Sequence, residues 1–231
     1  MQRANDQIRT LKAQFDIFQY APGSVLLELG NTKILCSVTV VSGVPPFLKG
    51  SGSGWMTAEY SMLPAATHIR KKRDAIKPSG RSVEISRLIG RSLRSVSDLS
   101  HFGEKTVHID CDVMQADGGT RTASIIAAYL ALKKAENKLM KSGDIKAPIL
   151  TAEVAAISTG IAQGEYVLDL NYEQDSKATI DLNFVLTKDN KLIELQGTAE
   201  GEPVSWSDFD KLRDLAKKGA EQIFAFYDTL K

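Results

Sequence analysis

The feature that most constrains the fold is a run of small and apolar residues from about Thr122 to Glu136. Its composition predicts a helix that is apolar nearly all round, and other elements must bury such a helix on almost every side. We therefore expect this helix to be the central element of the core. The apolar fraction of 43% and the charged fraction of 25% are typical of a globular protein and exclude a disordered or collagen-like chain.

Strand patterns are predicted on both sides of this helix, and Gly30-Asn31-Thr32 indicates a hairpin. Two amphipathic helices are expected at 83–99 and 206–230, the second capped by Ser205 with Asp208 three residues later. This order predicts an α+β domain. No linker divides the chain, so residues 1–231 are expected to form a single compact domain. Strands are predicted at residues 24–29, 33–41, 106–113, 154–159, 166–170, 178–186 and 191–197.

Charge is unevenly distributed along the chain. The formal net charge of +1 alone argues against a nucleic-acid partner. However, residues 65–94 hold nine Lys or Arg and two acids, whereas residues 161–210 hold eleven acids and three Lys. This asymmetry is compatible with a polyanionic partner and a separate metal-binding region, and equally with two solvated surfaces.

The cellular compartment is inferred from the cysteines and from the absence of a targeting pattern. Cys36 and Cys111 lie in apolar surroundings, which favours buried thiols over a disulfide or a zinc site. The N-terminal segment is too polar for a signal peptide, and no apolar run reaches the length of a membrane span. We expect a cytoplasmic protein.

The sharpest local motif is Asp117-Gly118-Gly119-Thr120-Arg121-Thr122, between a predicted strand and the central helix. Its glycines allow close backbone approach, and the helix N-terminus offers unpaired N–H groups to an anion such as phosphate. A tight strand-to-helix turn is the alternative. The motif is not a Walker A loop, because Gly-Lys-Ser/Thr is missing. Arg81 either points into the same pocket or covers a helix surface, and taken alone the second is favoured.

Two carboxylates mark a second candidate site. Strand alternation places Asp181 on the face opposite Ile180 and Leu182, and Asp175 lies near the preceding turn. Such oxygen ligands suit Mg²⁺ or Mn²⁺, although solvent-exposed strand acids are the commoner case. Together with a phosphate site they would form a phosphoryl-transfer centre.

Two other groups of side chains are less specific. The run Arg70-Lys71-Lys72-Arg73 either holds a polynucleotide backbone or is a solvated loop. No histidine has the spacing of a metal ligand or of a hydrolase triad.

Read together, several stretches resemble one family, ribonuclease PH, the phosphate-dependent exoribonucleases. The most specific stretch is Asp110–Ser124, and the resemblance spans nearly the whole chain in order. The matching segments are residues 23–25 with 30–33, 44–50, 54–64, 79–81, 84–85 with 87–91, 110–124, 168–173 and 194–198.

The resemblance implies a 3′-to-5′ exoribonuclease that uses inorganic phosphate as nucleophile and releases nucleoside diphosphates. Its expected substrate is precursor tRNA, trimmed downstream of CCA, with ribosomal RNA as a further candidate, and the reverse reaction is nucleotidyl transfer. It also implies duplicated β-α units with mixed sheets packed on central helices, and a ring-shaped homohexamer, a trimer of dimers. The alternative is a non-catalytic, RNA-binding ring subunit of an exosome-like assembly.

The resemblance also assigns roles to residues. Phosphate would be held by Arg81, Gly119, Thr120 and Arg121. The acidic pair Asp175 and Asp181 would be catalytic and bind Mg²⁺ (or Mn²⁺). RNA would be bound by Arg70, Lys71, Lys72 and Arg73.

Three positions depart from the family pattern. Only Arg3 could match the end of the usual Arg-x-Asp-Gly-Arg element, so its first residues are expected to be missing or trimmed. Ala65 stands where an arginine is usual, and Ser53 where a lysine is common. We therefore expect weaker or redistributed affinity for tRNA, with the phosphate and acidic sites intact.

Overall fold

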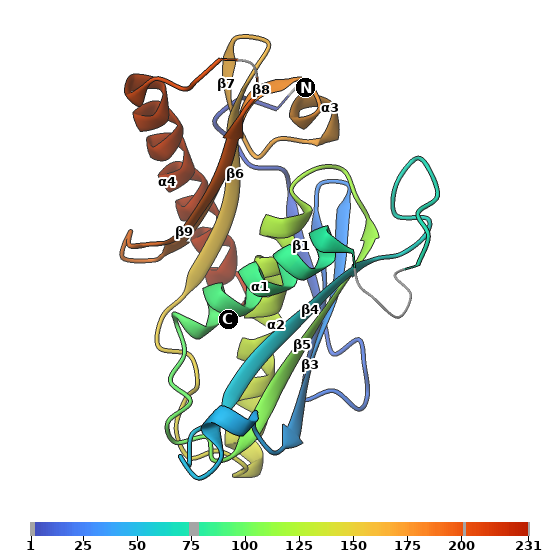
Figure 1. Cartoon of the computed structure of the whole chain (residues 1–231), viewed down its shortest axis with the longest axis vertical. Coiled ribbons are helices and arrows are strands. Elements are labelled where there is room, and N and C mark those ends of the chain that lie inside the picture. Colours follow the sequence, from blue (N-terminus) through green and yellow to red (C-terminus); the bar gives the residue numbers. More distant parts are fainter. Residues whose placement is uncertain (1–2, 74–78, 201, 231) are drawn as a thin grey trace.

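The computed structural model describes residues 3–73, 79–200 and 202–230. Two sheets and the helices around them form an α+β fold, which confirms the predicted class (Figure 1). The first sheet contains β1 (Leu11–Phe15), β2 (Gly23–Leu29), β3 (Thr32–Ser42), β4 (Trp55–Met62) and β5 (Lys105–Gln115). The second contains β6 (Val154–Ala162), β7 (Glu165–Leu168), β8 (Ala178–Thr187) and β9 (Leu192–Ala199). The helices are η1 (Pro46–Leu48), α1 (Gly80–Arg94), α2 (Thr120–Ser142), α3 (Tyr172–Asp175) and α4 (Trp206–Asp228).

The first sheet is mixed, with the order β1-β2-β3-β5-β4. Its pairs are antiparallel except for β4 and β5, which run parallel. This brings the C-terminal end of β4 next to the end of β5, so the loops that follow the two strands leave from the same edge. Helix α1 packs on β4 and against α2.

Helix α2 lies between the two sheets, as its apolar composition predicts. It contacts β2 and β3 on one side and β6 on the other, and most of its residues from Thr120 to Glu136 are buried. The contact with β2 depends on a glycine, because a Cβ atom on Gly23 would lie 2.1 Å from the carbonyl oxygen of Ala131. The predicted central element is therefore confirmed, and it extends to Ser142.

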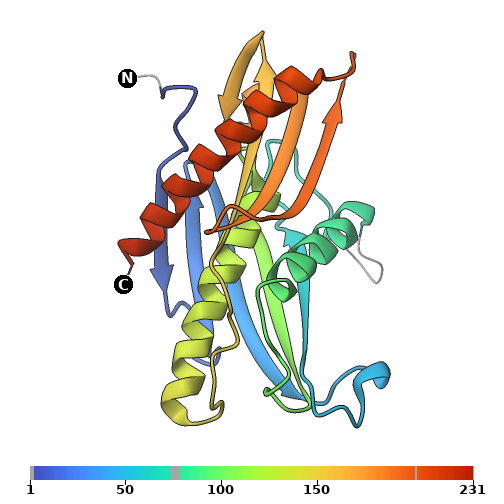
Figure 2. The same cartoon turned by 90° about the vertical axis from the view of Figure 1, so that its left-hand side faces the viewer.

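The second sheet is antiparallel throughout, with the order β7-β6-β8-β9. Helix α4 packs along β6, β7 and β8 (Figure 2). The Ser205 side chain accepts a hydrogen bond from the backbone N–H of Asp208, so the predicted helix cap is confirmed. In Figure 1 this sheet and α4 form the upper part of the molecule, above the first sheet.

Some elements differ from the sequence prediction. Strands β1 and β4 and the short helix α3 have no counterpart among the predicted elements. Helix α1 ends at Arg94 rather than near residue 99. The helix ends there because the next residues form hydrogen bonds elsewhere: the Asp98 N–H donates to the Ile149 carbonyl oxygen, and the Val96 carbonyl oxygen accepts from the Thr151 N–H. Val96 is still buried, which accounts for the apolar pattern beyond the helix end.

Cys36 and Cys111 are both buried and free, with their sulfur atoms 3.5 Å apart on neighbouring strands β3 and β5. This confirms the prediction of buried thiols. Among the described residues, no helix combines the length and the hydropathy needed to cross a bilayer.

Replacing Ile126 by alanine tests whether α2 is the centre of the core. Ile126 is 0% exposed, so Ile126→Ala is expected to lower the free energy of unfolding by about 2–5 kcal/mol through the cavity it leaves. Urea unfolding measures this loss. The same substitution at Ile69, which is 84% exposed, should change it by less than about 0.5 kcal/mol. Equal losses for the two variants would contradict the assignment.

Candidate functional site

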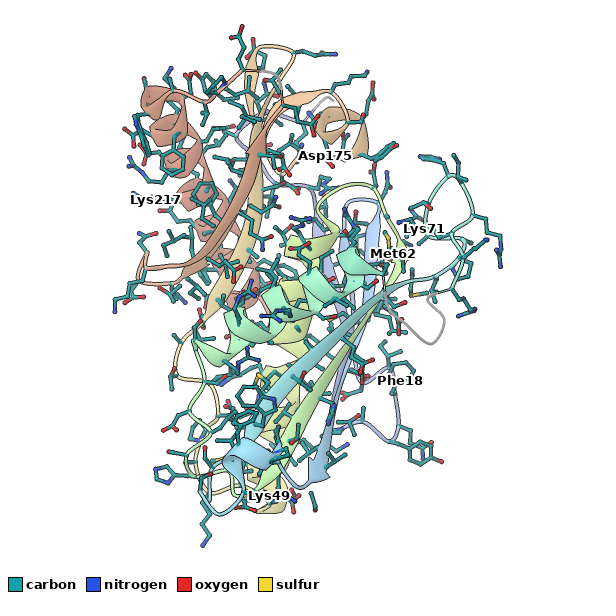
Figure 3. All side chains as sticks on the ribbon, in the orientation of Figure 1. Phe18, Lys49, Met62, Lys71, Asp175 and Lys217 are labelled. Atoms are coloured by element: carbon teal, nitrogen blue, oxygen red, sulfur yellow. The ribbon has the colours of Figure 1, made fainter. Side chains whose placement is uncertain are left out.

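A cavity of about 640 Å³ opens between the two sheets. One wall comes from the loop after β4 and the first residues of α1 and α2, and the other comes from α3 and β8. In Figure 3 Asp175 lies on the upper part of the molecule, above Met62 and Lys71. Residues predicted from the sequence that line the cavity are Arg70, Lys71, Arg81, Gly119, Thr120, Arg121, Asp175 and Asp181. The structure thus brings the predicted phosphate and acidic residues together.

The motif of residues 117–122, called the phosphate motif below, leads into the N-terminus of α2. Its Gly119 is the capping residue and lies in the left-handed region (φ 64°, ψ 25°). Gly118 also has a positive φ of 74°, and a Cβ on it would lie 2.6 Å from the Leu170 carbonyl oxygen. The Thr32 hydroxyl donates to the Gly118 carbonyl oxygen at 2.7 Å and accepts from the Asp117 N–H at 3.0 Å. These contacts hold the loop tightly, with the unpaired N–H groups of the helix at the cavity.

A buried ion pair that sequence reasoning missed holds the back of this loop. The Arg9 guanidinium donates to both carboxylate oxygens of Asp169, at 2.7 and 2.9 Å, and also to the carbonyl oxygens of Asp117 and Gly118. Asp169 is 0% exposed and has a positive φ of 56°. Arg3 adds a contact to the same carboxylate at 3.2 Å. The pair joins the N-terminal segment and the second sheet to the phosphate loop.

Tyr60 connects the two helix starts that carry the predicted phosphate residues. Its hydroxyl donates to the Thr120 hydroxyl oxygen at 3.0 Å and is also hydrogen-bonded to Arg81. Burial raises the pKa of Tyr60, so the phenol stays protonated. On the other side, Arg121 donates to the Gln196 amide oxygen at 3.1 Å and lies 3.6 Å from a carboxylate oxygen of Glu84. Arg81 and Arg121 are thereby held at the same cavity.

The acidic wall consists of Asp175, the last residue of α3, and Asp181 on β8. Burial, followed by the charge of Asp175, raises the pKa of Asp181 to about 6, although its carboxylate accepts a bond from the Asn183 amide at 3.0 Å. Loss of water also raises the pKa of Asp175 at the cavity rim, while Arg81 and Arg121 lower it. Two carboxylates that are costly to ionise together favour a bound cation.

The donor set fits Mg²⁺ or Mn²⁺. Within residues 3–73, 79–200 and 202–230 no group of three or more His, Cys, Asp or Glu could hold a metal ion. Mg²⁺ does not need such a group, because it is commonly held by one or two carboxylates together with water and substrate phosphates. Asp175 and Asp181 supply that number of carboxylates beside the phosphate motif.

The predicted RNA-binding run separates in the structure. Arg70 and Lys71 line the main cavity, and Lys71 also lines, together with Lys72, a smaller hollow of about 190 Å³ beside Tyr60. In the described part of the chain Arg73 lines neither hollow. Burial raises the pKa of Asp112, and the charge of Arg73 acts against this rise. Two charges of the basic segment 65–94, Asp74 and Lys77, lie outside the described residues.

Comparisons with known proteins agree with this architecture. A model described as the 3′ exoribonuclease family, domain 1, matches residues 7–137, and domain 2 of the same family matches residues 152–219. Rice (Oryza sativa) Rrp46 is similar in structure, with a TM-score of 0.80 and 18% identity over 99% of this chain and 97% of that one. A chain of the Archaeoglobus fulgidus exosome with RNA bound to the active site has a TM-score of 0.80 and 22% identity over 99% and 91%. A chain of an archaeal exosome core has a TM-score of 0.71 and 23% identity over 92% and 84%.

Replacing Asp181 by asparagine should stabilise the metal-free protein at neutral pH. Its raised pKa means that ionisation destabilises the folded state above about pH 6, and this cost vanishes below about pH 3.8, where the group is protonated in both states. Asp181→Asn is therefore expected to add about 1–3 kcal/mol above pH 6 and nothing near pH 3.5. Urea unfolding in EDTA across this range measures the difference.

Asp189 provides the control for this prediction. Lys191 and the Thr187 hydroxyl lower the pKa of this exposed carboxylate, so Asp189→Asn should not stabilise the protein at any pH. If Asp181→Asn raised the free energy of unfolding equally at every pH, the ionisation of Asp181 would not be the cause of the stabilisation.

Removing Arg9 should destabilise the protein because it leaves the Asp169 carboxylate buried and poorly paired. Arg9→Met is expected to lower the free energy of unfolding by about 3 kcal/mol, and adding Asp169→Asn should restore part of it. Urea unfolding measures the free energy of unfolding of both variants. The control is Arg213→Met, which breaks an exposed ion pair with Asp210 and should lower this free energy by less than about 1 kcal/mol. Equal losses for Arg9→Met and Arg213→Met would contradict this role.

Proposed function

The chain belongs to the 3′ exoribonuclease family, and we propose that it is an active, phosphate-dependent member that shortens RNA from the 3′ end. One observation carries the proposal. The cavity that contains the N-terminus of α2 with Arg81 and Arg121 also contains Asp175 and Asp181. A site for inorganic phosphate alone would not need the two carboxylates, whereas phosphoryl transfer uses both an anion clamp and a cation.

The proposed reaction is an exchange of one phosphorus–oxygen bond for another. An oxygen of inorganic phosphate bonds to the phosphorus of the last nucleotide, and the bond from that phosphorus to the 3′ oxygen of the preceding ribose breaks. The proton of hydrogen phosphate passes to this 3′ oxygen, so the products are a nucleoside diphosphate and a shortened RNA. The reverse reaction adds a nucleotide.

The residues of the cavity have distinct roles in this proposal. Arg81, Arg121 and the N–H groups at Gly119 and Thr120 offset the repulsion between phosphate and the RNA phosphodiester and hold them in line. Mg²⁺ or Mn²⁺, held by Asp175 and Asp181, would supply positive charge against the charge that develops on the leaving oxygen. No general base is needed, because phosphate is already ionised at neutral pH.

We propose precursor tRNA as the substrate, in the cytoplasm, with ribosomal RNA as a further candidate. Arg70 and Lys71 at the cavity bind the RNA backbone in this proposal, and Lys72 and Arg73 contact RNA farther from the reacting end. From the family resemblance we also propose that the subunits form a ring-shaped homohexamer. Ala65, which is exposed, removes one cation from this region, so tRNA affinity is expected to be lower than in relatives with an arginine there.

A non-catalytic ring subunit is the second candidate function. The observation that favours it is the structural similarity over 99% of the chain to Rrp46 and to a chain of an exosome. Such a subunit would bind RNA within a ring without releasing products. The presence of Arg81, Arg121, Asp175 and Asp181 in one cavity favours the active enzyme.

Arg121→Ala tests the proposed activity. Wild-type protein incubated with 3′-extended RNA and Mg²⁺ is expected to release nucleoside diphosphates only when phosphate is present. Arg121→Ala should lower kcat/KM for phosphate by about 100-fold, because it removes a charged donor to the reacting phosphate. Arg213→Ala removes an exposed arginine of α4 and should leave the rate unchanged. Chromatography of the nucleotide products measures both identity and rate.

Two results of this assay would contradict the enzyme. Release of nucleoside monophosphates without phosphate would indicate hydrolysis. Absence of any product, together with tight RNA binding that Asp181→Asn does not alter, would favour the ring subunit.

A further inference from the structure

One side chain of the cavity has no role in binding phosphate or metal. Tyr172, the first residue of α3, lines the cavity and is 53% exposed. Its hydroxyl makes no hydrogen bond with any described residue, so the polar group does not explain why a tyrosine stands there. An aromatic ring that is open to a cavity is available for stacking.

Backbone contacts fix the position of Tyr172 between Asp175 and the loop that contains Gly118. Helix α3 is a single turn closed by a capping box between Asn171 and Gln174. Tyr172 and Asp175 are three residues apart in it and therefore lie on the same side. At the phosphate loop, the Tyr172 N–H donates to an Asp117 carboxylate oxygen at 3.4 Å, and a Cβ on Gly118 would lie 2.7 Å from the Tyr172 nitrogen. The ring thus projects from the junction of the two sites.

Two further residues, from the loop after β4, line the cavity beside Tyr172. His68 lies with its ring centroid 5.8 Å from that of Tyr172, at an interplanar angle of 50°. Ile69, the next residue, lines the same cavity and is 84% exposed. These residues form a patch at the cavity that contains neither lysine, arginine, aspartate nor glutamate, whereas Arg81, Arg121, Asp175 and Asp181 line other parts of the same cavity.

We propose that Tyr172 stacks on an unpaired base near the 3′ end of the RNA, with His68 and Ile69 bordering the same base. This inference rests on the proposed function and adds the subsite for the base to the sites for phosphate and metal. Stacking on a ring accepts any base, because each base has an aromatic face. The subsite therefore binds single-stranded ribonucleotides without base preference and requires the 3′ end to be unpaired.

Binding of a fluorescent single-stranded RNA, measured by anisotropy without phosphate, tests the subsite separately from catalysis. Tyr172→Ala is expected to weaken binding about tenfold, and Tyr172→Phe, which keeps the ring, to restore affinity to within about twofold. Trp206→Ala removes an aromatic ring that is 82% exposed but lies outside the cavity lining, so it should not change binding. Thermal unfolding verifies that each variant is folded.

An abasic nucleotide placed at successive positions from the 3′ end identifies the contacted base. At one position the abasic RNA should bind wild-type protein about tenfold more weakly, and Tyr172→Ala should cause no further loss there. Additive losses at every position, or an affinity of Tyr172→Ala within about twofold of wild type, would overturn the inference. If the losses are non-additive at one position but the wild-type protein does not carry out phosphorolysis, the subsite is supported and the proposed enzymatic function is contradicted. If it binds no RNA, both fail.

Discussion

The buried Asp169 carboxylate holds together the segments that enclose the cavity. One of its oxygens accepts a hydrogen bond of 2.7 Å from the guanidinium of Arg9, which lies in the N-terminal segment. The same guanidinium donates to the carbonyl oxygens of Asp117 and Gly118 in the phosphate motif. Asp169 itself follows β7 of the second sheet. Since a buried carboxylate is strongly unfavourable without a partner, these three segments keep their positions together. The distance between the phosphate motif on one wall and the acidic pair on the other therefore depends on this interaction.

Opposite charges on the two walls define what the cavity can bind. Burial raises the pKa of both Asp175 and Asp181, and the charge of Asp175 raises that of Asp181 further. Arg81 and Arg121 on the other wall lower both, but the net result is a raised pKa for each acid. The cavity thus contains both positively charged groups that can bind an anion and carboxylates that can bind a cation. The net charge of +1 conceals this, because the basic and acidic segments cancel in the total while facing each other in the fold.

Local patterns in the sequence predicted much of the site. The Gly118-Gly119 motif before an apolar helix has a local physical meaning, and strand alternation suffices to orient Asp181. The ion pair of Arg9 with Asp169 was not predicted, because it joins residues 160 positions apart and no local pattern connects the two. The role of Tyr60 was not predicted either, because its strand β4 was not predicted and its partner Thr120 is 60 positions away. The run of four basic residues did not reveal which side chains face the cavity.

The central claim is that phosphate and a divalent cation bind side by side in this cavity. Mn²⁺ is paramagnetic and shortens the ³¹P relaxation time of a phosphate held within a few ångströms. The most direct measurement is therefore ³¹P relaxation of inorganic phosphate with Mn²⁺ and either wild-type protein or the double variant Asp175→Asn/Asp181→Asn. The account predicts a strong enhancement with wild type that is lost in the double variant, and equal relaxation with the two proteins would contradict it.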